Sequence, residues 1–127
     1  MRLQILPLLL LSALVAPNAA AADGPDLFAM DVVFALNAKG MCRGVDVVVG
    51  DLVSAAHRRN VDPSVIEQVR DMVLSTGKTI PQHITRAINV AGKMIALDSD
   101  GGARPEKWCA AMVPRLKRDG LIRPFKH

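Results

Sequence analysis

Aromatic residues are scarce in this sequence, which has no tyrosine, one tryptophan and three phenylalanines. Surfaces that stack sugars or nucleobases need several exposed aromatic rings. The scarcity therefore argues against a carbohydrate-binding or nucleobase-stacking protein. It also predicts a core built mainly from aliphatic side chains.

Cysteine is equally scarce, and the only two cysteines, Cys42 and Cys109, lie far apart in the chain. Their spacing is not that of a redox-active Cys-x-x-Cys pair. Closing the loop of about 67 residues between them would remove about 4 kcal/mol of denatured-chain entropy, a large share of a small domain's stability. We therefore predict a structural disulfide within the chain, with an intermolecular bridge as the alternative.

Recognisable catalytic motifs are missing as well. The sequence has no Gly-x-Ser-x-Gly elbow, no His-Glu-x-x-His helix and no recognised cysteine and histidine arrangement. The acidic residues form no recognisable pair of general acid and general base. We therefore expect a protein without enzymatic activity that needs no cofactor.

The apolar run at the start of the chain is too short to cross a membrane. It extends from Leu3 to Val15, about 13 residues, whereas a transmembrane helix needs roughly 20. Arg2 precedes the run and the alanines 19–22 follow it, which is the order of a secretory signal peptide. We expect residues 1–22 to be removed and residues 23–127 to form one domain, exported to a bacterial periplasm or secreted, without a transmembrane anchor.

The mature chain predicts an all-α fold, a small bundle of four to five short helices stapled by one disulfide. Glycines and prolines divide it into five segments. The first begins at Pro25 and ends near Gly40. The others are Val45 to Asn60, Asp62 to Gly77, Thr79 to Asp98 and a last segment from Pro105. The second segment is ambiguous, because its valines favour a strand while its apolar spacing favours a helix, and we choose the helix.

Several local signals place the helix ends and faces. Asp62 is expected to cap the third helix, and Thr79 and Gln82 to form a capping box on the fourth. Pro114 is expected to bend or shorten the last helix. The predicted buried faces of the last three segments contain Val65, Ile66, Val69, Met72 and Val73, then Ile84, Ile88, Ala91 and Ile95, and finally Trp108, Met112 and Leu116.

Two groups of residues were considered as metal sites. Asp98, Asp100 and Glu106 carry the oxygen ligands that hard cations prefer, but their order does not fit a calcium-binding loop, and a helix-to-helix turn explains them more simply. Methionines can bind soft metals, but Met72 and Met94 fall on or beside apolar helix faces, which predicts core packing. We therefore expect no metal, and retain the three carboxylates only as candidates.

Positive charge gathers near the end of the chain. In an exported protein this basic stretch would meet an acidic protein or an anionic surface, and not chromosomal DNA. The residues of this candidate interaction surface are Arg115, Lys117, Arg118, Arg123 and Lys126.

The expected function is that of a small exported protein-binding domain, chaperone-like or inhibitor-like, whose partner is another envelope protein. A small-ligand or metal-ion carrier of the cell envelope is the alternative. In broad plan, helical with one disulfide, the chain is similar to the small acid-stress chaperones of bacterial periplasms. The similarity extends to no particular motif and assigns no family.

Overall fold

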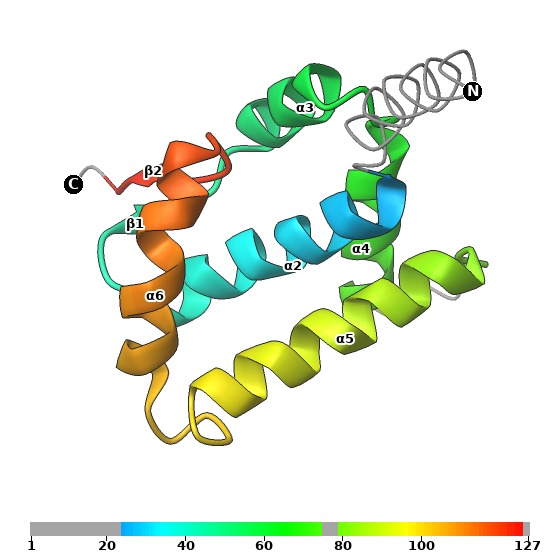
Figure 1. Cartoon of the computed structure of the whole chain (residues 1–127). Helices are drawn as coiled ribbons and strands as arrows, with labels where there is room; N and C mark the ends of the chain where they lie inside the picture. Colours follow the sequence, from blue (N-terminus) through cyan, green and yellow to red (C-terminus); the bar gives the residue numbers. More distant parts are fainter. Residues whose placement is uncertain (1–23, 75–78, 126–127) are drawn as a thin grey trace, which may run out of the picture.

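The computed structural model describes residues 24–74 and 79–125, and Figure 1 shows how they are arranged. The predicted bundle of short helices with one disulfide is confirmed, and a two-stranded antiparallel pair that the sequence did not predict is added to it. The expected signal segment 1–22, Gly77 and Lys126 lie outside the described residues. The elements in chain order are α2 (Pro25–Met41), β1 (Val45–Asp46), α3 (Val49–Arg58), α4 (Ser64–Leu74), α5 (Gln82–Asp98), α6 (Pro105–Arg118) and β2 (Arg123–Pro124).

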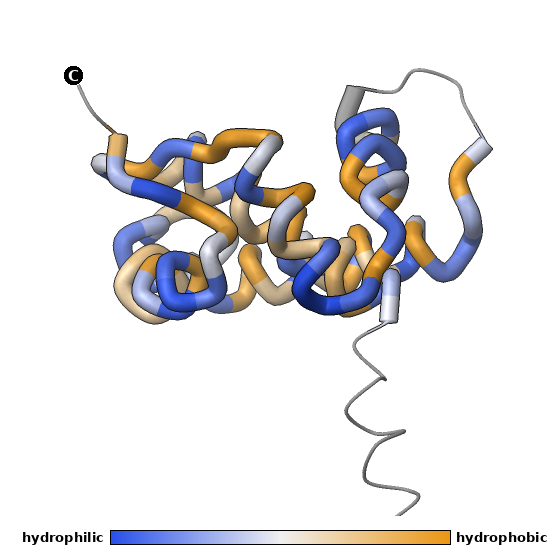
Figure 2. Tube along the Cα trace, turned by 90° about the horizontal axis from the view of Figure 1, so that it is seen from above, coloured by the Kyte–Doolittle hydropathy of each residue, from blue (hydrophilic) through white to orange (hydrophobic). Residues whose placement is uncertain are grey.

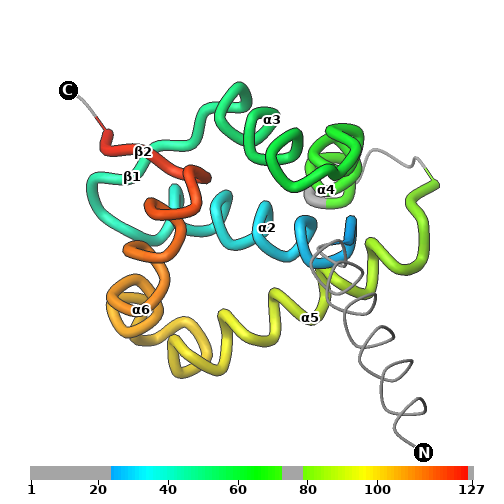
Figure 3. Tube along the Cα trace, turned by 45° about the horizontal axis from the view of Figure 1, so that its top comes forward, coloured from blue at the N-terminus to red at the C-terminus, as the bar shows by residue number. Residues whose placement is uncertain are grey.

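The first described helix, α2, is the centre of the molecule. Figure 3 shows it running between α3 and α4 on one side and α5 on the other, and α6 lies across its C-terminal end. A helix that is apolar on all sides must be covered on all sides, and α2 is such a helix. Its buried residues are Phe28, Ala29, Asp31, Val32, Val33, Phe34, Ala35 and Ala38.

Both ends of α2 follow the sequence. Pro25 is its first residue, as predicted, because a proline in the first turn removes an N–H that would have no partner within the helix. The predicted end near Gly40 is confirmed to within one residue, since the helix ends at Met41 and the Cys42 amide bonds to the Ala38 carbonyl at 2.9 Å. The chain then turns at Gly44, whose φ of 68° is one that glycine adopts without strain.

The segment 45–60 was predicted as one helix, and that prediction is half wrong. Val45 and Asp46 are extended and pair with Pro124 and Arg123, and α3 begins only at Val49. β-branched valines lose little in an extended chain, and the pairing with β2 is a tertiary contact that local periodicity does not reveal. The pairing of β1 with β2 connects the last described residues of the chain to the turn after α2.

The helices α4 and α5 begin differently from one another. The Asp62 carboxylate accepts a hydrogen bond of 2.9 Å from the Ser64 amide, which confirms the predicted cap of α4. The capping box of Thr79 and Gln82 is wrong, because α5 begins at Gln82 with Pro81 at the capping position and no side-chain cap.

The predicted inner faces of these helices are largely correct. Val65, Ile66 and Val69 are buried on α4, as are Ile84, Ala91 and Ile95 on α5, while Met72 and Ile88 are partly exposed. The side chain of Val73 lies outside the described part of the chain. Hydrophobic and hydrophilic residues alternate along the tube in Figure 2, as amphipathic helices around a shared core require.

The last helix begins at Pro105, as predicted, and buries Trp108, Met112 and Leu116. Pro114 does not shorten it, and α6 continues for four residues beyond this proline to Arg118. A proline inside a helix removes one backbone hydrogen bond, and the packing of Met112 and Leu116 on either side of it offsets that loss.

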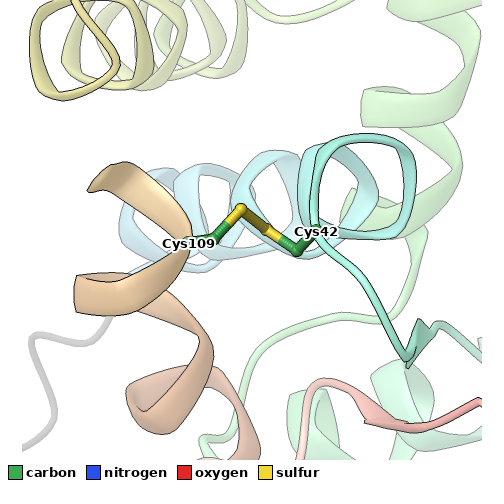
Figure 4. Close-up of a disulfide and its surroundings, with 2 residues drawn as sticks. All are labelled: Cys42 and Cys109. Carbon is green, nitrogen blue, oxygen red and sulfur yellow. A yellow bond between two sulfur atoms is a disulfide. The ribbon is translucent and has the colours of Figure 1, made fainter. Parts of the chain in front are cut away.

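The disulfide between Cys42 and Cys109 is intramolecular, with a Cα–Cα distance of 5.7 Å. Figure 4 shows it joining the turn after α2 to the first half of α6. The predicted staple between the front of the bundle and its last helix is thus confirmed. Within the described ranges, no helix has the length and apolar character needed to cross a membrane.

Candidate functional site

One carboxylate lies inside the otherwise apolar central helix. Asp31 of α2 is only 7 % exposed, and two arginines from other elements bind it. Arg59, directly after α3, donates from Nη1 to Oδ2 at 2.7 Å, and Arg115 of α6 donates from Nη2 to Oδ1. Burying a carboxylate is unfavourable unless it is paired and hydrogen-bonded, and both conditions are met here.

The same two arginines lie over aromatic rings of α2. The Arg59 guanidinium carbon is 5.1 Å from the centre of the Phe28 ring, and that of Arg115 is 5.7 Å from the centre of the Phe34 ring. Phe28, Asp31 and Phe34 are three residues apart, so the rings lie on either side of the carboxylate on one helix face. This Asp31 cluster, defined here as these five residues, fastens the ends of α3 and α6 to the central helix.

An open cleft of about 670 Å³ adjoins the Asp31 cluster. It lies between the C-terminal ends of α3 and α6, and polar groups dominate its walls. We call it the arginine cleft, and its lining residues are Asp31, Arg58, Arg59, Arg118, Asp119 and Gly120.

Arg58, the last residue of α3, donates from Nη2 to the backbone oxygen of Asp119, the residue directly after α6, at 3.1 Å. Gly120 leaves the room for this contact, because a Cβ at that position would lie 2.6 Å from Arg58 Nη2. The end of α3 is therefore joined to the end of α6 directly, through Arg58 and the Asp119 carbonyl, and indirectly, through the Asp31 carboxylate of α2 that Arg59 and Arg115 both bind.

A row of exposed apolar side chains runs along the outer side of α5. Val90, Met94 and Leu97 are 41 %, 38 % and 77 % exposed, and their spacing of four and three residues places them on one face. Arg86 and Lys93 are exposed beside them. The predicted core packing of Met94 is therefore wrong. We call Val90, Met94 and Leu97 the α5 row.

A second open cavity of about 670 Å³ lies beside the disulfide, and its wall is mainly apolar. Cys42 and Cys109 both contribute to it, together with Met41 and Val113. No free cysteine occurs among the described residues, so this wall contains the oxidised bridge but no thiol that could attack it.

The three carboxylates considered as metal ligands are not brought together as a binding group. Asp100 Oδ2 pairs with Lys107 Nζ at 3.3 Å, and Glu106 Oε1 with Arg104 Nε at 3.2 Å. A hydrogen bond from its own backbone amide, followed by that from Arg104, lowers the pKa of Glu106. In the described part of the chain no three histidine, cysteine or acidic side chains gather in a way that could hold a metal ion, Asp98 included.

The basic residues near the end of the chain do not form one free surface. Arg115 points inward to Asp31, and Arg123 of β2 makes two hydrogen bonds of 2.7 Å to the carboxylate of Asp51 on α3. This contact with Arg123 lowers the pKa of Asp51. Lys117 and Arg118 are exposed on α6, and Arg123 is 52 % exposed while it pairs with Asp51, so three of the predicted residues are exposed among those described.

The sequence reasoning missed both the Asp31 cluster and the α5 row. A signal for the first was present, because Asp31 is the only charged residue in the apolar stretch 27–36. A signal for the second was present in α5, because Val90, Met94 and Leu97 lie outside its predicted buried face of Ile84, Ile88, Ala91 and Ile95.

Comparisons with known proteins do not place the chain in a family: no family model matches it, and neither does any curated protein or any solved structure.

Proposed function

We propose that this protein is a non-enzymatic interaction domain that binds another protein through the α5 row. The observation that carries the proposal is the exposure of Val90, Met94 and Leu97 on consecutive turns of one helix. Single exposed apolar residues are common, but three in a continuous line on one helix are a frequent feature of binding surfaces. The role is chaperone-like or inhibitor-like.

The charges beside the row indicate what kind of partner fits. Arg86 and Lys93 lie along one edge of the α5 row, and α5 has no acidic residue before Asp98 at its end. A partner with an apolar strip bordered by carboxylates would match both the apolar and the charged part of this face. The charges of Arg86 and Lys93 would then make binding depend on the salt concentration, and the apolar contacts of the α5 row would set the lifetime of the complex.

Export to the cell envelope is part of the proposal. The order of charges, apolar residues and alanines in residues 1–22 supports it, and so does the disulfide between Cys42 and Cys109, because such bonds persist in oxidising compartments. The expected mature protein begins at Asp23. Intact-mass measurement of the protein from the envelope fraction tests this, and a mass that includes residues 1–22 contradicts it.

Position-specific photocrosslinking tests the interaction surface. A photoreactive p-benzoylphenylalanine is placed at Leu97 in the full-length chain, and at Ser54 of α3 as an exposed control position. Irradiation of intact cells is expected to give protein adducts from the Leu97 position that the Ser54 position does not give. The substitution Met94→Asp in the same chain is expected to remove them.

The pattern of adducts also separates the two roles and exposes a failure. One discrete adduct indicates an inhibitor-like partner, whereas a series of adducts of many sizes indicates chaperone clients. Equal adducts from Leu97 and Ser54, or adducts from Leu97 that persist with Met94→Asp, contradict the proposal.

A further inference from the structure

The arginine cleft has the features of a binding site that the α5 row does not explain. Three guanidinium groups, those of Arg58, Arg59 and Arg118, lie on its walls and come from the ends of two helices. Its volume of about 670 Å³ is within the range of small-molecule sites. The cleft is on a different part of the molecule from α5, whose residues do not line it.

Two of the three guanidinium groups are held in place before any ligand arrives. Arg58 is fixed by its hydrogen bond to the Asp119 carbonyl, and Gly120, which has no side chain, leaves room for it. Arg59 is fixed by the Asp31 carboxylate and the Phe28 ring. Ordering long side chains on binding is unfavourable, so groups that are already ordered bind an anion more tightly. Arg118 is 73 % exposed and can close over a ligand from the other side.

The carboxylates of the cleft do not use up its hydrogen-bond donors. Asp31 is bound by Arg59 and Arg115. The nearest Asp119 oxygens are 3.7 Å from Arg115 and 3.9 Å from Arg118, which is beyond hydrogen-bond range. A guanidinium has five N–H donors, and the one hydrogen bond described for Arg58 uses one of them. Arg58 and Arg118 therefore have donors to offer an oxyanion.

We propose that the arginine cleft binds the phosphate group of a small phosphorylated ligand or of a phospholipid headgroup, through Arg58 and Arg118. Arginine forks match phosphate oxygens in pairs. Guanidinium groups that approach from two helix ends suit a tetrahedral group, which presents oxygens in several directions, better than a planar carboxylate. This inference does not depend on the proposed protein partner.

Titration followed by NMR tests the site in the oxidised, full mature chain. Inorganic phosphate and glycerol 3-phosphate are each added at constant ionic strength, with sodium chloride and acetate as reference anions. We expect saturable shifts of the backbone amides of Arg59, Asp119 and Gly120 with both phosphates, and not with the reference anions. Losing one charge-assisted contact, in Arg58→Gln or Arg118→Gln, is expected to weaken binding about ten-fold.

The matched control is Arg70→Gln on α4, which removes the same charge from an exposed residue that does not line the cleft and is expected to weaken phosphate binding less than about two-fold. Flotation with phosphatidylglycerol vesicles separates the two sources of phosphate. Binding to vesicles alone, lost in Arg58→Gln and Arg118→Gln, supports the site with a headgroup as its ligand. The absence of saturable binding to soluble phosphates and vesicles alike, or equal weakening by Arg70→Gln, overturns the proposal.

Discussion

The two longest helices in the described part of the chain, α2 and α5, are each 17 residues long and pack against one another, yet they break the usual pattern of burial in opposite ways. The central helix α2 buries a charged residue, Asp31, inside an apolar stretch. The outer helix α5 leaves apolar residues, the α5 row, in contact with water. One helix has a charge inside, and the other has apolar side chains outside.

The difference between these exceptions is whether the molecule itself explains them. Arg59 and Arg115 neutralise Asp31, so its burial is accounted for by contacts within the fold. Nothing in the described residues covers Leu97, although other apolar residues of α5, such as Ile84, pack fully against the core. We infer that Asp31 serves the stability of the fold and the α5 row serves recognition.

Among changes to the contacts of α2, removing the disulfide is expected to lower the free energy of unfolding most. Replacing both cysteines, Cys42→Ser with Cys109→Ser, releases a crosslink between residues 67 apart and is expected to lower the free energy of unfolding by about 4 kcal/mol. Chemical denaturation measures it. A loss below about 1 kcal/mol would mean that α6 remains fastened to α2 without the bridge, through the Asp31 cluster alone.

Disrupting the Asp31 cluster is expected to have the second-largest effect on the free energy of unfolding. Asp31→Asn keeps the shape of the side chain but leaves two arginines without their anion, and we expect a loss of about 3 kcal/mol in the free energy of unfolding. Asp119→Asn, at an exposed carboxylate, is the control and is expected to change stability by less than about 0.5 kcal/mol. Equal effects at the two positions would show that the buried carboxylate has no special role.

The two faces of α5 can be compared directly. Ile84→Val removes one methylene from the buried face and is expected to lower the free energy of unfolding by about 1 kcal/mol. Leu97→Ala removes more atoms, but from an exposed position, and is expected to change stability by less than about 0.5 kcal/mol. The comparison between buried and exposed faces is wrong if the Leu97 substitution is the more destabilising of the two.

The smallest effect is the pH dependence of the Asp51 and Arg123 pair, which joins α3 to β2. The hydrogen bond from Arg123 lowers the folded-state pKa of Asp51 below its ordinary value of 3.8, so the pair stabilises the fold above that value. This contribution is lost as pH falls through the lowered pKa. Melting temperatures of the native chain and Asp51→Asn are expected to differ slightly at about pH 7 and to converge as the pH falls below 3.8 and through the lowered pKa. A difference that grows on acidification would contradict the assignment.

The sequence predicted those parts of the fold that depend on neighbouring residues. Pro25 and Pro105 begin helices because their rings suit the first turn, and the two cysteines, Cys42 and Cys109, allow only one pairing within the chain. The inner face of α5 followed from its periodicity. Each of these features needs only the local chain or a unique pairing.

The features that the sequence did not predict depend on distant residues. The partners of Asp31 lie 28 and 84 residues further along the chain, so no local pattern indicates that this carboxylate is satisfied. The extended residues Val45 and Asp46 need the end of the chain beside them. Met94 lies next to a buried face, and only the arrangement of α2 shows that it is left outside.

The central claim is that the α5 row is exposed for a partner and contributes little to folding. Its most direct test is the yield of crosslinked adducts from p-benzoylphenylalanine at Leu97 with and without Val90→Asn and Met94→Asn, in chains whose free energy of unfolding is also measured. We predict that the two substitutions abolish the adducts while changing stability by less than about 1 kcal/mol. Undiminished adducts, or a loss of several kcal/mol in stability, would contradict the claim.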